Sequence, residues 1–531
     1  MIAEPRSTAR APYAELAFVG AAFLLLCAAV AAGRAVDVTA ALLAVTAVLA
    51  VGHRVATRWD VLIALLVVIV LAIPIKRYEF AVELPFDLEP YRIFIALLVG
   101  LWVAALLVDP RIEPRGTFLD RPLLLIALGV VVSIALNPDT ITRYNVLQSM
   151  AGAELPAPVR NAEKLPFVDV STDVTKALLF FLSFVLVYYL IASVVRTRRA
   201  IELIVRTLVA GGTVVAALAI VERRTGFNAF DSLGNVLPLL QFEGSLEEVG
   251  RGGGRLRVYG PAQHPIALAA LLVMLLPLSL YLAYVARRWY WYLAAAAIGL
   301  GTMATVSRTG VVMLVAMAAV LGVLRPPALT KLWLLALPAL IAIHLVVPGA
   351  IGGLRQAFFP EQGLIADQTE YGGRISARRL GPQFAIIREQ PAFGQGYGTR
   401  VTAGRTRNAR ILDNQWLATG VETGLVGVAA WVWLFVRYVR RVGGAARRDP
   451  GPRGWLLAAL AASVAAFAVG MFTFDAFSFI QATVILFVLL ALGAATLAAQ
   501  AEWWPGEPRA AAPPSRPARF RSSQRLADPS G

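Results

Sequence analysis

The stretches LIALLVVIVLAIPI (residues 62–75) and TVILFVLLALGAATLAA (residues 483–499) decide the fold class of this chain. Both consist of aliphatic and other uncharged residues. A helix that crosses a bilayer takes roughly 20 mostly apolar residues, and similar blocks recur along nearly the whole length. The sequence therefore predicts an all-α integral membrane protein.

The composition agrees with this class. The chain has 531 residues, of which 58% are hydrophobic and 15% are charged, whereas about 25% of residues are charged in soluble proteins. The formal net charge is +16. Because the basic residues lie in short clusters between the apolar blocks, they indicate orientation in a membrane and not nucleic-acid binding.

The apolar blocks predict about 12–14 transmembrane helices. We expect spans beginning near residues 15, 36, 60, 92, 121, 176, 201, 262, 289, 309, 331, 416, 455 and 477. With the amino terminus in the cytoplasm, every short arginine-rich loop falls on the cytoplasmic side. This orientation predicts a multi-pass protein of the cell (cytoplasmic) membrane, with both termini cytoplasmic and the active site extracytoplasmic.

The same topology divides the chain into segments. They are a cytoplasmic N-terminal segment (1–14), transmembrane helices 1–7 with an outer loop at 137–175 (15–222), an outer basic loop with helices 8–11 (223–348), a long extracytoplasmic loop (349–415), helices 12–14 (416–500) and a disordered basic cytoplasmic tail (501–531).

Arginines on the predicted outer face need another explanation than orientation. Arg257 lies in RGGGRLRVYG, Arg308 in SRTG and Arg374 in the long loop. A guanidinium matches phosphate oxygens with two parallel hydrogen bonds, so these residues predict a phosphate site. The structural alternative is snorkelling to the headgroups, or a salt bridge from Arg308 to Glu222 or Glu422.

The long loop has a helical pattern that we expect to break at Gly381–Pro382. Arg374 and Arg378 are four residues apart and would project together from a short interfacial helix. The following PAFGQGYGT (391–399) is expected to be a turn-rich connector, because neither a strand nor a P-loop lysine accompanies it.

The motifs GPAQHP (260–265), SRTG (307–310), GGR (372–374), PAFGQGYGT and DNQWLATGVETGLVG (413–427) follow one another in this order. Together they resemble the O-antigen ligase and O-antigen polymerase superfamily of bacterial membrane glycosyltransferases, over roughly residues 200–440. Members transfer a glycan from undecaprenyl diphosphate to an acceptor hydroxyl on the outer face, with inversion, without a metal and without a nucleotide sugar.

The resemblance implies a role for particular residues. Arg308 and Arg374 would clamp the donor diphosphate, with Arg257 as a third member, and Asp413 and Asn414 would be catalytic and face the acceptor. Many members have His-Asn where this chain has Asp413–Asn414, and the histidine is the usual proton acceptor. An aspartate, with a reference pKa of about 3.9, is ionised at neutral pH and can accept a late proton.

Further residues would support this site. His264 is either an alternative base or simply the residue that opens a helix before Pro265. Glu422 is expected to pair with an arginine or to support the packing of its helix. Gly424 and Gly427 are expected to allow close helix packing.

The resemblance leaves the acceptor open. A lipid core would make the protein a ligase, a second lipid-linked glycan a polymerase, and a protein acceptor is a third possibility. The expected partners are an undecaprenyl-diphosphate-linked glycan, a glycan, lipid or protein acceptor and the lipid bilayer; we expect no nucleic acid, cofactor or metal.

Two other function classes compete with this interpretation. A metal-assisted glycosyltransferase would use Asp87 and Glu89 in PFDLEP (85–90) to hold a divalent ion. A transporter or flippase of lipid-linked glycans would need ionisable residues within its spans, for which His344 and Asp475 are the candidates.

Overall fold

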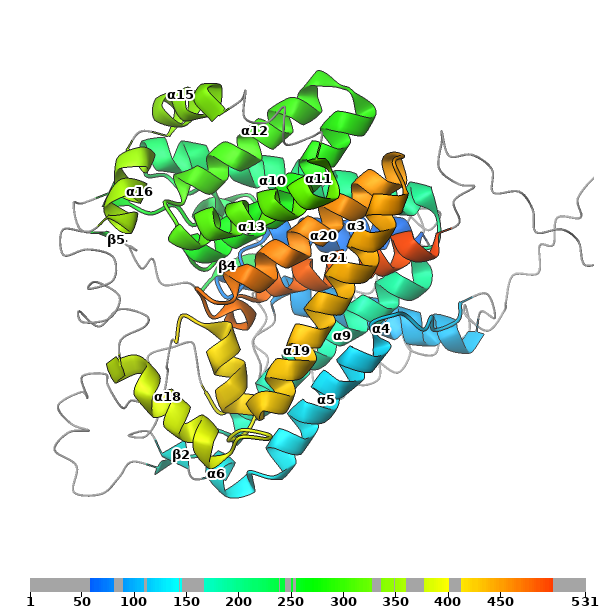
Figure 1. The fold of residues 1–531 in the computed structure, drawn as a ribbon, viewed down its shortest axis with the longest axis vertical. Coiled ribbons are helices and arrows are strands. Elements are labelled where there is room, and N and C mark those ends of the chain that lie inside the picture. The colour runs from blue at the N-terminus through cyan, green and yellow to red at the C-terminus, as the bar shows by residue number, and fades with distance from the viewer. Residues whose placement is uncertain are drawn as a thin grey trace, which may run out of the picture.

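The computed structural model describes residues 58–80, 89–108, 112–142, 144–145, 167–237, 239–243, 250–251, 255–326, 336–347, 349–359, 377–400 and 412–499. Helices make up most of these ranges, and their strands are few and short (Figure 1). The predicted all-α class is therefore confirmed. The spans expected near residues 15 and 36 and the tail at 501–531 lie outside the described residues.

The described helices are α3 (Trp59–Ala72), α4 (Pro90–Val108), α5 (Asp120–Ala135), α6 (Pro138–Thr142), α9 (Ser171–Val194), α10 (Arg198–Thr225), α11 (Pro265–Ala286), α12 (Trp289–Ala304), α13 (Arg308–Leu324), α15 (Ala336–Val346), α16 (Ala350–Phe358), α18 (Ala377–Glu389), α19 (Gln415–Arg448), α20 (Pro452–Gly470) and α21 (Ile480–Ala498), with short 3-10 helices η1 (Ala229–Asn235) and η3 (Ala476–Ser478). Every span expected from residue 60 onward corresponds to one of these helices.

Within the described ranges, seven helices are long and apolar enough to cross a membrane. They are α4, α9, α10, α11, α19, α20 and α21, and α3 and α13 are apolar but shorter. The class of multi-pass membrane protein is confirmed by these helices. The exact number of spans stays a prediction.

Helices α11, α20 and α21 form the centre of the bundle. Their apolar residues surround the whole helix, which is typical of a helix buried on all sides, and α11 and α21 are buried along nearly their whole lengths. Helix α20 packs against α11, α13 and α19. The Ser463 hydroxyl of α20 donates to the carbonyl of Met274 in α11 at 2.6 Å, which satisfies its hydrogen-bonding group inside the apolar core.

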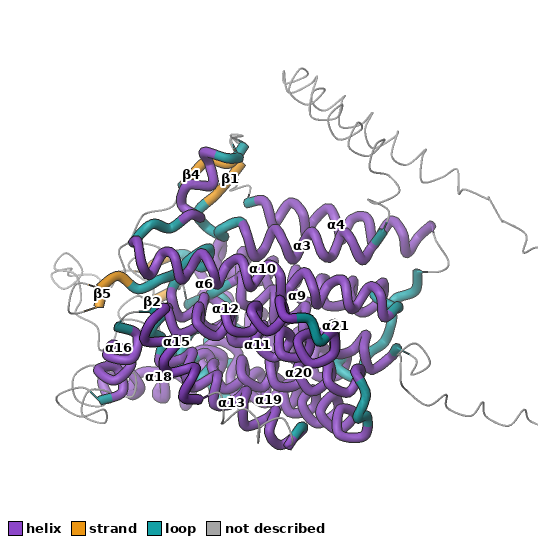
Figure 2. The backbone as a smooth tube through the Cα atoms, turned by 90° about the horizontal axis from the view of Figure 1, so that it is seen from above, coloured by secondary structure: helices purple, strands orange, loops and turns teal. Residues whose placement is uncertain are grey.

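The strands lie at one end of the bundle, which we call the loop end and define by the described residues 73–80, 144–145, 167–170, 226–237, 239–243, 250–251, 255–264, 391–400 and 471–479 (Figure 2). They form two-stranded antiparallel pairs: β1 (Tyr78–Phe80) with β4 (Leu240–Phe242), β2 (Tyr144–Asn145) with β3 (Phe167–Val168), and β5 (Gly250–Arg251) with β6 (Arg255–Leu256). The predicted orientation makes this end extracytoplasmic.

A buried arginine fixes the β1 segment to the loop before α11. Arg77 is bonded to Asp231 at 2.9 Å and donates to the carbonyls of Gly260 and Ala262. Its guanidinium also lies over the Tyr259 ring, 4.6 Å from the centroid. Burial raises the pKa of Tyr259 to about 12, and the charge of Asp231 adds to the shift. These contacts hold the neighbouring Lys76 at a fixed place in the loop end.

The long loop contains short helices, as predicted, but its expected break is wrong. Helix α18 runs without interruption from Ala377 to Glu389, across Gly381 and Pro382. Proline fixes φ near the helical value and removes one N–H donor. Pro382 is the sixth residue of α18, so the helix lacks one backbone hydrogen bond there and nevertheless continues to Glu389.

Candidate functional site

Helix α19 is broken at Gly424, and the break shapes the site. Gly424 has φ 66° and ψ −166°, a conformation that is essentially restricted to glycine. The break separates a half-helix, 415–423, from a longer arm, 425–448, and Figure 1 shows the two arms meeting at a sharp bend. The expectation that Gly424 serves helix packing is therefore wrong, because its conformation is what bends the chain.

The glycine-rich segment fills this break. Broken helices leave backbone groups without partners. Here the amides of Gln395 and Gly396 donate to the carbonyls of Val421 and Glu422 at 2.9 and 3.2 Å. On the other side, the amide of Leu425 donates to the carbonyl of Pro391 at 2.8 Å. The turn-rich connector predicted at 391–399 is confirmed, and it stabilises the bend.

Helix α5 and the start of α6 fasten the same region from a distant part of the chain. The Ser133 hydroxyl donates to the Glu422 carbonyl at 2.5 Å, and the Asn137 amide group donates to the Gly394 carbonyl at 3.0 Å. Both polar side chains are buried. The backbone around Glu422 is consequently held from two sides.

A cavity of about 650 Å³ lies beside the half-helix, within the range of typical ligand pockets, about 300–1,000 Å³. Its lining contains charged, polar and apolar side chains. The charged group comprises Lys76, Glu79, Glu89, Arg92, Asp173, Lys176 and Glu243; the polar group comprises Tyr397, Arg400, Gln415, Thr419, Glu422 and Thr423; and the apolar group includes Ile126, Val130, Phe181, Phe184, Trp431 and Phe487. The cavity is therefore amphipathic.

Three buried charged side chains, those of Arg400, Glu422 and Asp475, lie together beside this cavity. Nη1 of Arg400 lies 3.1 Å from Oδ2 of Asp475, and Nε of Arg400 lies 3.7 Å from Oε1 of Glu422. The backbone amide of Leu412 also donates to Asp475 Oδ2, at 2.9 Å. The expectation that Glu422 pairs with an arginine agrees with this arrangement, and the partner is Arg400.

A second set of charged side chains, those of Lys76, Glu89 and Arg92, also lines the cavity. Glu89 accepts the backbone N–H of Lys76 at 2.5 Å and is paired with Arg92 at 2.6 Å. Burial raises the pKa of Glu89, although the charge of Arg92 opposes the shift. Burial also lowers the pKa of Lys76. Asp87, the other carboxylate of the competing metal hypothesis, lies outside the described residues.

The residues predicted for the acceptor stand directly before the half-helix. Asn414 is its N-cap, and its side-chain oxygen accepts the amide of Leu417 at 3.1 Å. Asp413 has φ 54°, an uncommon value for a residue other than glycine. Of the described residues, the cavity lining includes Gln415 and Glu422 but neither Asp413 nor Asn414.

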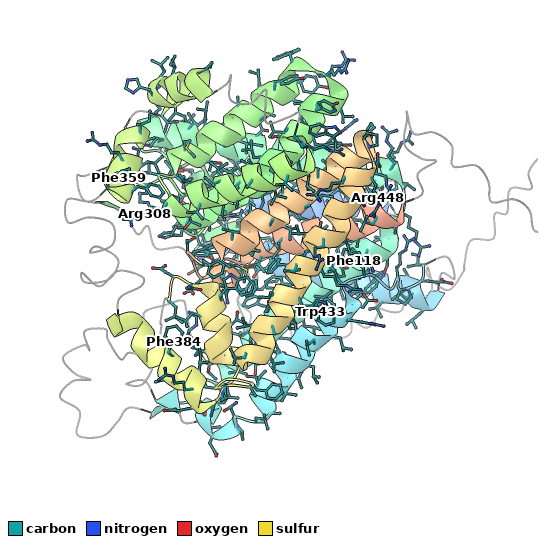
Figure 3. The ribbon with its side chains drawn as sticks, in the orientation of Figure 1. Phe118, Arg308, Phe359, Phe384, Trp433 and Arg448 are labelled. Carbon is teal, nitrogen blue, oxygen red and sulfur yellow. The ribbon has the colours of Figure 1, made fainter. Side chains whose placement is uncertain are left out.

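The described residues predicted for the donor, Arg308 and Arg257, lie on different elements. Arg308 is the first residue of α13, and its neighbour Thr309 donates to the carbonyl of Thr473 at 3.5 Å, in the segment that contains Asp475. Figure 3 shows Arg308 and Arg448 at opposite ends of the bundle. Arg257 is buried in the segment before α11.

Three other predicted residues are placed differently. His264 caps α11, because its Nδ1 accepts the amide of Ile266 at 3.2 Å, in line with the helix-opening alternative. Arg378 belongs to α18. Arg374 lies outside the described residues.

The residues expected on a transport path do not lie inside spans together. Asp475 was expected within a span but lies between α20 and α21, at the start of η3. His344 lies on α15 and is exposed. Within the described ranges, no group of three or more His, Cys, Asp or Glu side chains is placed to hold a metal ion.

Arg400, Gln415 and Thr419 are the residues of the site that the sequence analysis did not single out. Gln415, Thr419 and Glu422 follow the spacing i, i+4, i+7, which places them on one helical face. This polar stripe in an otherwise apolar stretch is a signal that the sequence contains. Arg400, by contrast, is one of many arginines in the long loop, and its spacing does not distinguish it.

Comparison with known proteins bears on the same region. Residues 292–432 match the family model described as O-antigen ligase. The matched part runs from α12 to the longer arm of α19, and so includes the glycine-rich segment, Arg400 and Glu422. No curated protein is similar enough to the chain to match it. The match supports a resemblance to the O-antigen ligase and polymerase superfamily over residues 292–432.

Proposed function

We propose that this protein is a membrane glycosyltransferase of the O-antigen ligase type. It transfers a glycan from a polyprenyl diphosphate carrier to an acceptor hydroxyl at the extracytoplasmic face, with inversion and without a metal ion. The observation that carries this proposal is the amphipathic cavity beside the broken helix of the O-antigen ligase segment.

The composition of the cavity suits a lipid-linked glycan. Phe181, Phe184 and Phe487 provide an apolar surface for the first isoprene units of a carrier. The charged and polar side chains nearer the loop end offer hydrogen bonds to sugar hydroxyls. A single cavity therefore has a surface for the lipid and a surface for the sugar of the donor.

Arginine side chains would stabilise the leaving diphosphate. We assign this task to Arg308 and Arg374, with Arg257 in support. Preorganised positive charge is most effective where negative charge develops in the transition state. The contact between Thr309 and the segment that contains Asp475 supports Arg308 in this role, because it links the start of α13 to the charged cluster of Arg400.

Asp413 and Asn414 would serve the acceptor side. They immediately precede Gln415, which lines the cavity. Asn414 caps the half-helix and so sets the position of Asp413, which orients the acceptor hydroxyl.

The test is glycan transfer by purified protein from an undecaprenyl-diphosphate-linked donor, with EDTA present. A lipid core, a second lipid-linked glycan and a peptide are offered as separate acceptors, which distinguishes a ligase from a polymerase. Transfer that survives EDTA and is lost in Arg308→Ala supports the proposal. A requirement for a divalent ion, or movement of the lipid across vesicles without transfer, contradicts it.

A further inference from the structure

The side chain of Glu422 does more than support helix packing, because it lines the cavity. It is 7% exposed, and yet its side chain contributes to the cavity lining. Its backbone carbonyl is bonded by Gly396 and Ser133, so the bend is stabilised through the backbone. The carboxylate has no part in those hydrogen bonds.

Arg400 is bonded unequally to its two carboxylates. Its 3.1 Å contact with Asp475 is a hydrogen bond, whereas its 3.7 Å contact with Glu422 is longer than one. Asp475 also receives the amide of Leu412. Asp475 therefore holds the guanidinium, and Glu422 keeps the capacity to accept a hydrogen bond from a molecule in the cavity.

The charge balance of Arg400, Asp475 and Glu422 also indicates that Glu422 can accept a hydrogen bond or a proton from the cavity. Among the described residues, one guanidinium faces two carboxylates, and all three side chains are buried. A buried charge without compensation is unfavourable. A proton or a hydrogen-bond donor at the exposed side of the cluster would reduce this imbalance, and Glu422 is the carboxylate of the pair that reaches the cavity.

We propose that Glu422 is the catalytic residue that accepts the proton of the acceptor hydroxyl, and that Arg400 and Asp475 are its positioning residues. This inference rests on the proposed function, and it assigns to Glu422 the proton transfer that the motif comparison would give to Asp413. The polar face of Gln415, Thr419 and Glu422 then contacts the acceptor sugar.

The bonds in this step balance. The acceptor oxygen forms a bond to the anomeric carbon while the bond from that carbon to the diphosphate oxygen breaks, and the electron pair leaves with the diphosphate. The O–H bond of the acceptor breaks and its proton moves to the Glu422 carboxylate. Glu422 later returns this proton to the released diphosphate or to water.

The experiment compares Glu422→Gln with Asp413→Asn in the transfer assay, using the full chain in detergent. The matched control is Glu389→Gln, an exposed glutamate of α18. General-base catalysis contributes about 10²–10⁴-fold, so we expect Glu422→Gln to lower kcat at least about 100-fold with little change in the donor KM. Asp413→Asn should lower kcat less than about 10-fold, and the control should match the wild type.

A rescue measurement separates proton transfer from a structural role. Formate added to Glu422→Ala should restore part of kcat by replacing the missing carboxylate, and it should not restore Arg400→Ala. The inference is overturned if Glu422→Gln keeps more than about a tenth of the wild-type kcat, or if formate has no effect on a Glu422→Ala protein that still binds the donor. If the wild type transfers nothing, the proposed function itself has failed.

Discussion

Replacing Gly424 by alanine tests whether the bend of α19 builds the site. A Cβ atom at this position would overlap the carbonyl oxygen of Ala392 and lie 2.6 Å from the amide nitrogen of Phe393. Both are backbone atoms of the glycine-rich segment, so no side chain can turn away to make room. The backbone conformation is also strained for any residue with a Cβ.

The expected magnitude follows from these two effects. The conformation alone costs about 1–3 kcal/mol for a residue other than glycine. Relief of the overlap moves the segment away and breaks some of its hydrogen bonds to α19, each worth about 0.5–1.5 kcal/mol. With two of them lost, we expect Gly424→Ala to lower the free energy of unfolding by about 4 kcal/mol.

The assay is chemical unfolding of the purified protein in detergent, together with the transfer assay. Gly420→Ala is the matched control, because the nearest atom to its Cβ would be the end of the flexible Ile387 side chain, at 3.1 Å, and Val428 would lie at an ordinary contact distance of 3.7 Å. We expect the control to fold normally and Gly424→Ala to be destabilised and inactive. Equal stability of the two variants, within about 0.5 kcal/mol, would refute the argument.

Three further predictions concern the buried pairing of Arg400, the N-cap residue Asn414 and the buried carboxyl group of Glu89. Arg400→Met leaves two buried carboxylates without their cation, and should lower the free energy of unfolding by about 3–5 kcal/mol, whereas the exposed Arg388→Met should be neutral; equal unfolding curves would contradict this. Asn414→Ala removes a helix cap worth about 1 kcal/mol, and Asn414→Ser keeps it. When chemical unfolding of both variants is compared with that of the wild type, only the alanine variant should unfold more easily. Burial raises the pKa of Glu89, so the folded protein holds this proton more tightly than the unfolded chain does. The resulting contribution to the free energy of unfolding is present in full below the ordinary pKa of about 4.3 and is lost as the pH rises through the raised pKa. Between about pH 4 and pH 8, the unfolding midpoint of the wild type should therefore fall more than that of Glu89→Gln, and parallel midpoints would show that the carboxyl is not responsible.

The membrane fold could be predicted from the sequence because each apolar block fixes its own helix. The bilayer demands that backbone groups pair within a segment, so α11 and α21 follow from composition alone. The bend at Gly424 could not be predicted in this way. ETGLVG continues the apolar pattern of a helix, and the conformation of its glycine depends on a segment about 30 residues earlier.

In the candidate site, too, local features could be predicted from the sequence and long-range contacts could not. The polar stripe of Gln415, Thr419 and Glu422 is visible in the sequence, because helical spacing is a local property. The pairing of Arg400 with Asp475 joins residues 75 apart in the chain. Asp475 is noticeable in the sequence only as an ionisable residue among apolar blocks, and nothing near Arg400 distinguishes it from the other arginines of the long loop. Motif resemblance pointed to Asp413 and Asn414, whereas the three-dimensional arrangement points to Glu422.

The broken helix has a consequence for how the protein is made. The longer arm of α19 has 24 residues and begins with an uncharged stretch, 425–436, whereas the half-helix before it, with nine residues, is too short to cross the bilayer. The half-helix can therefore reach its place only by docking against helices already inserted, including α5, which is made much earlier. Synthesis of the longer arm precedes completion of the cavity, so substitutions in 391–399 should leave membrane insertion intact and instead impair the last step of assembly.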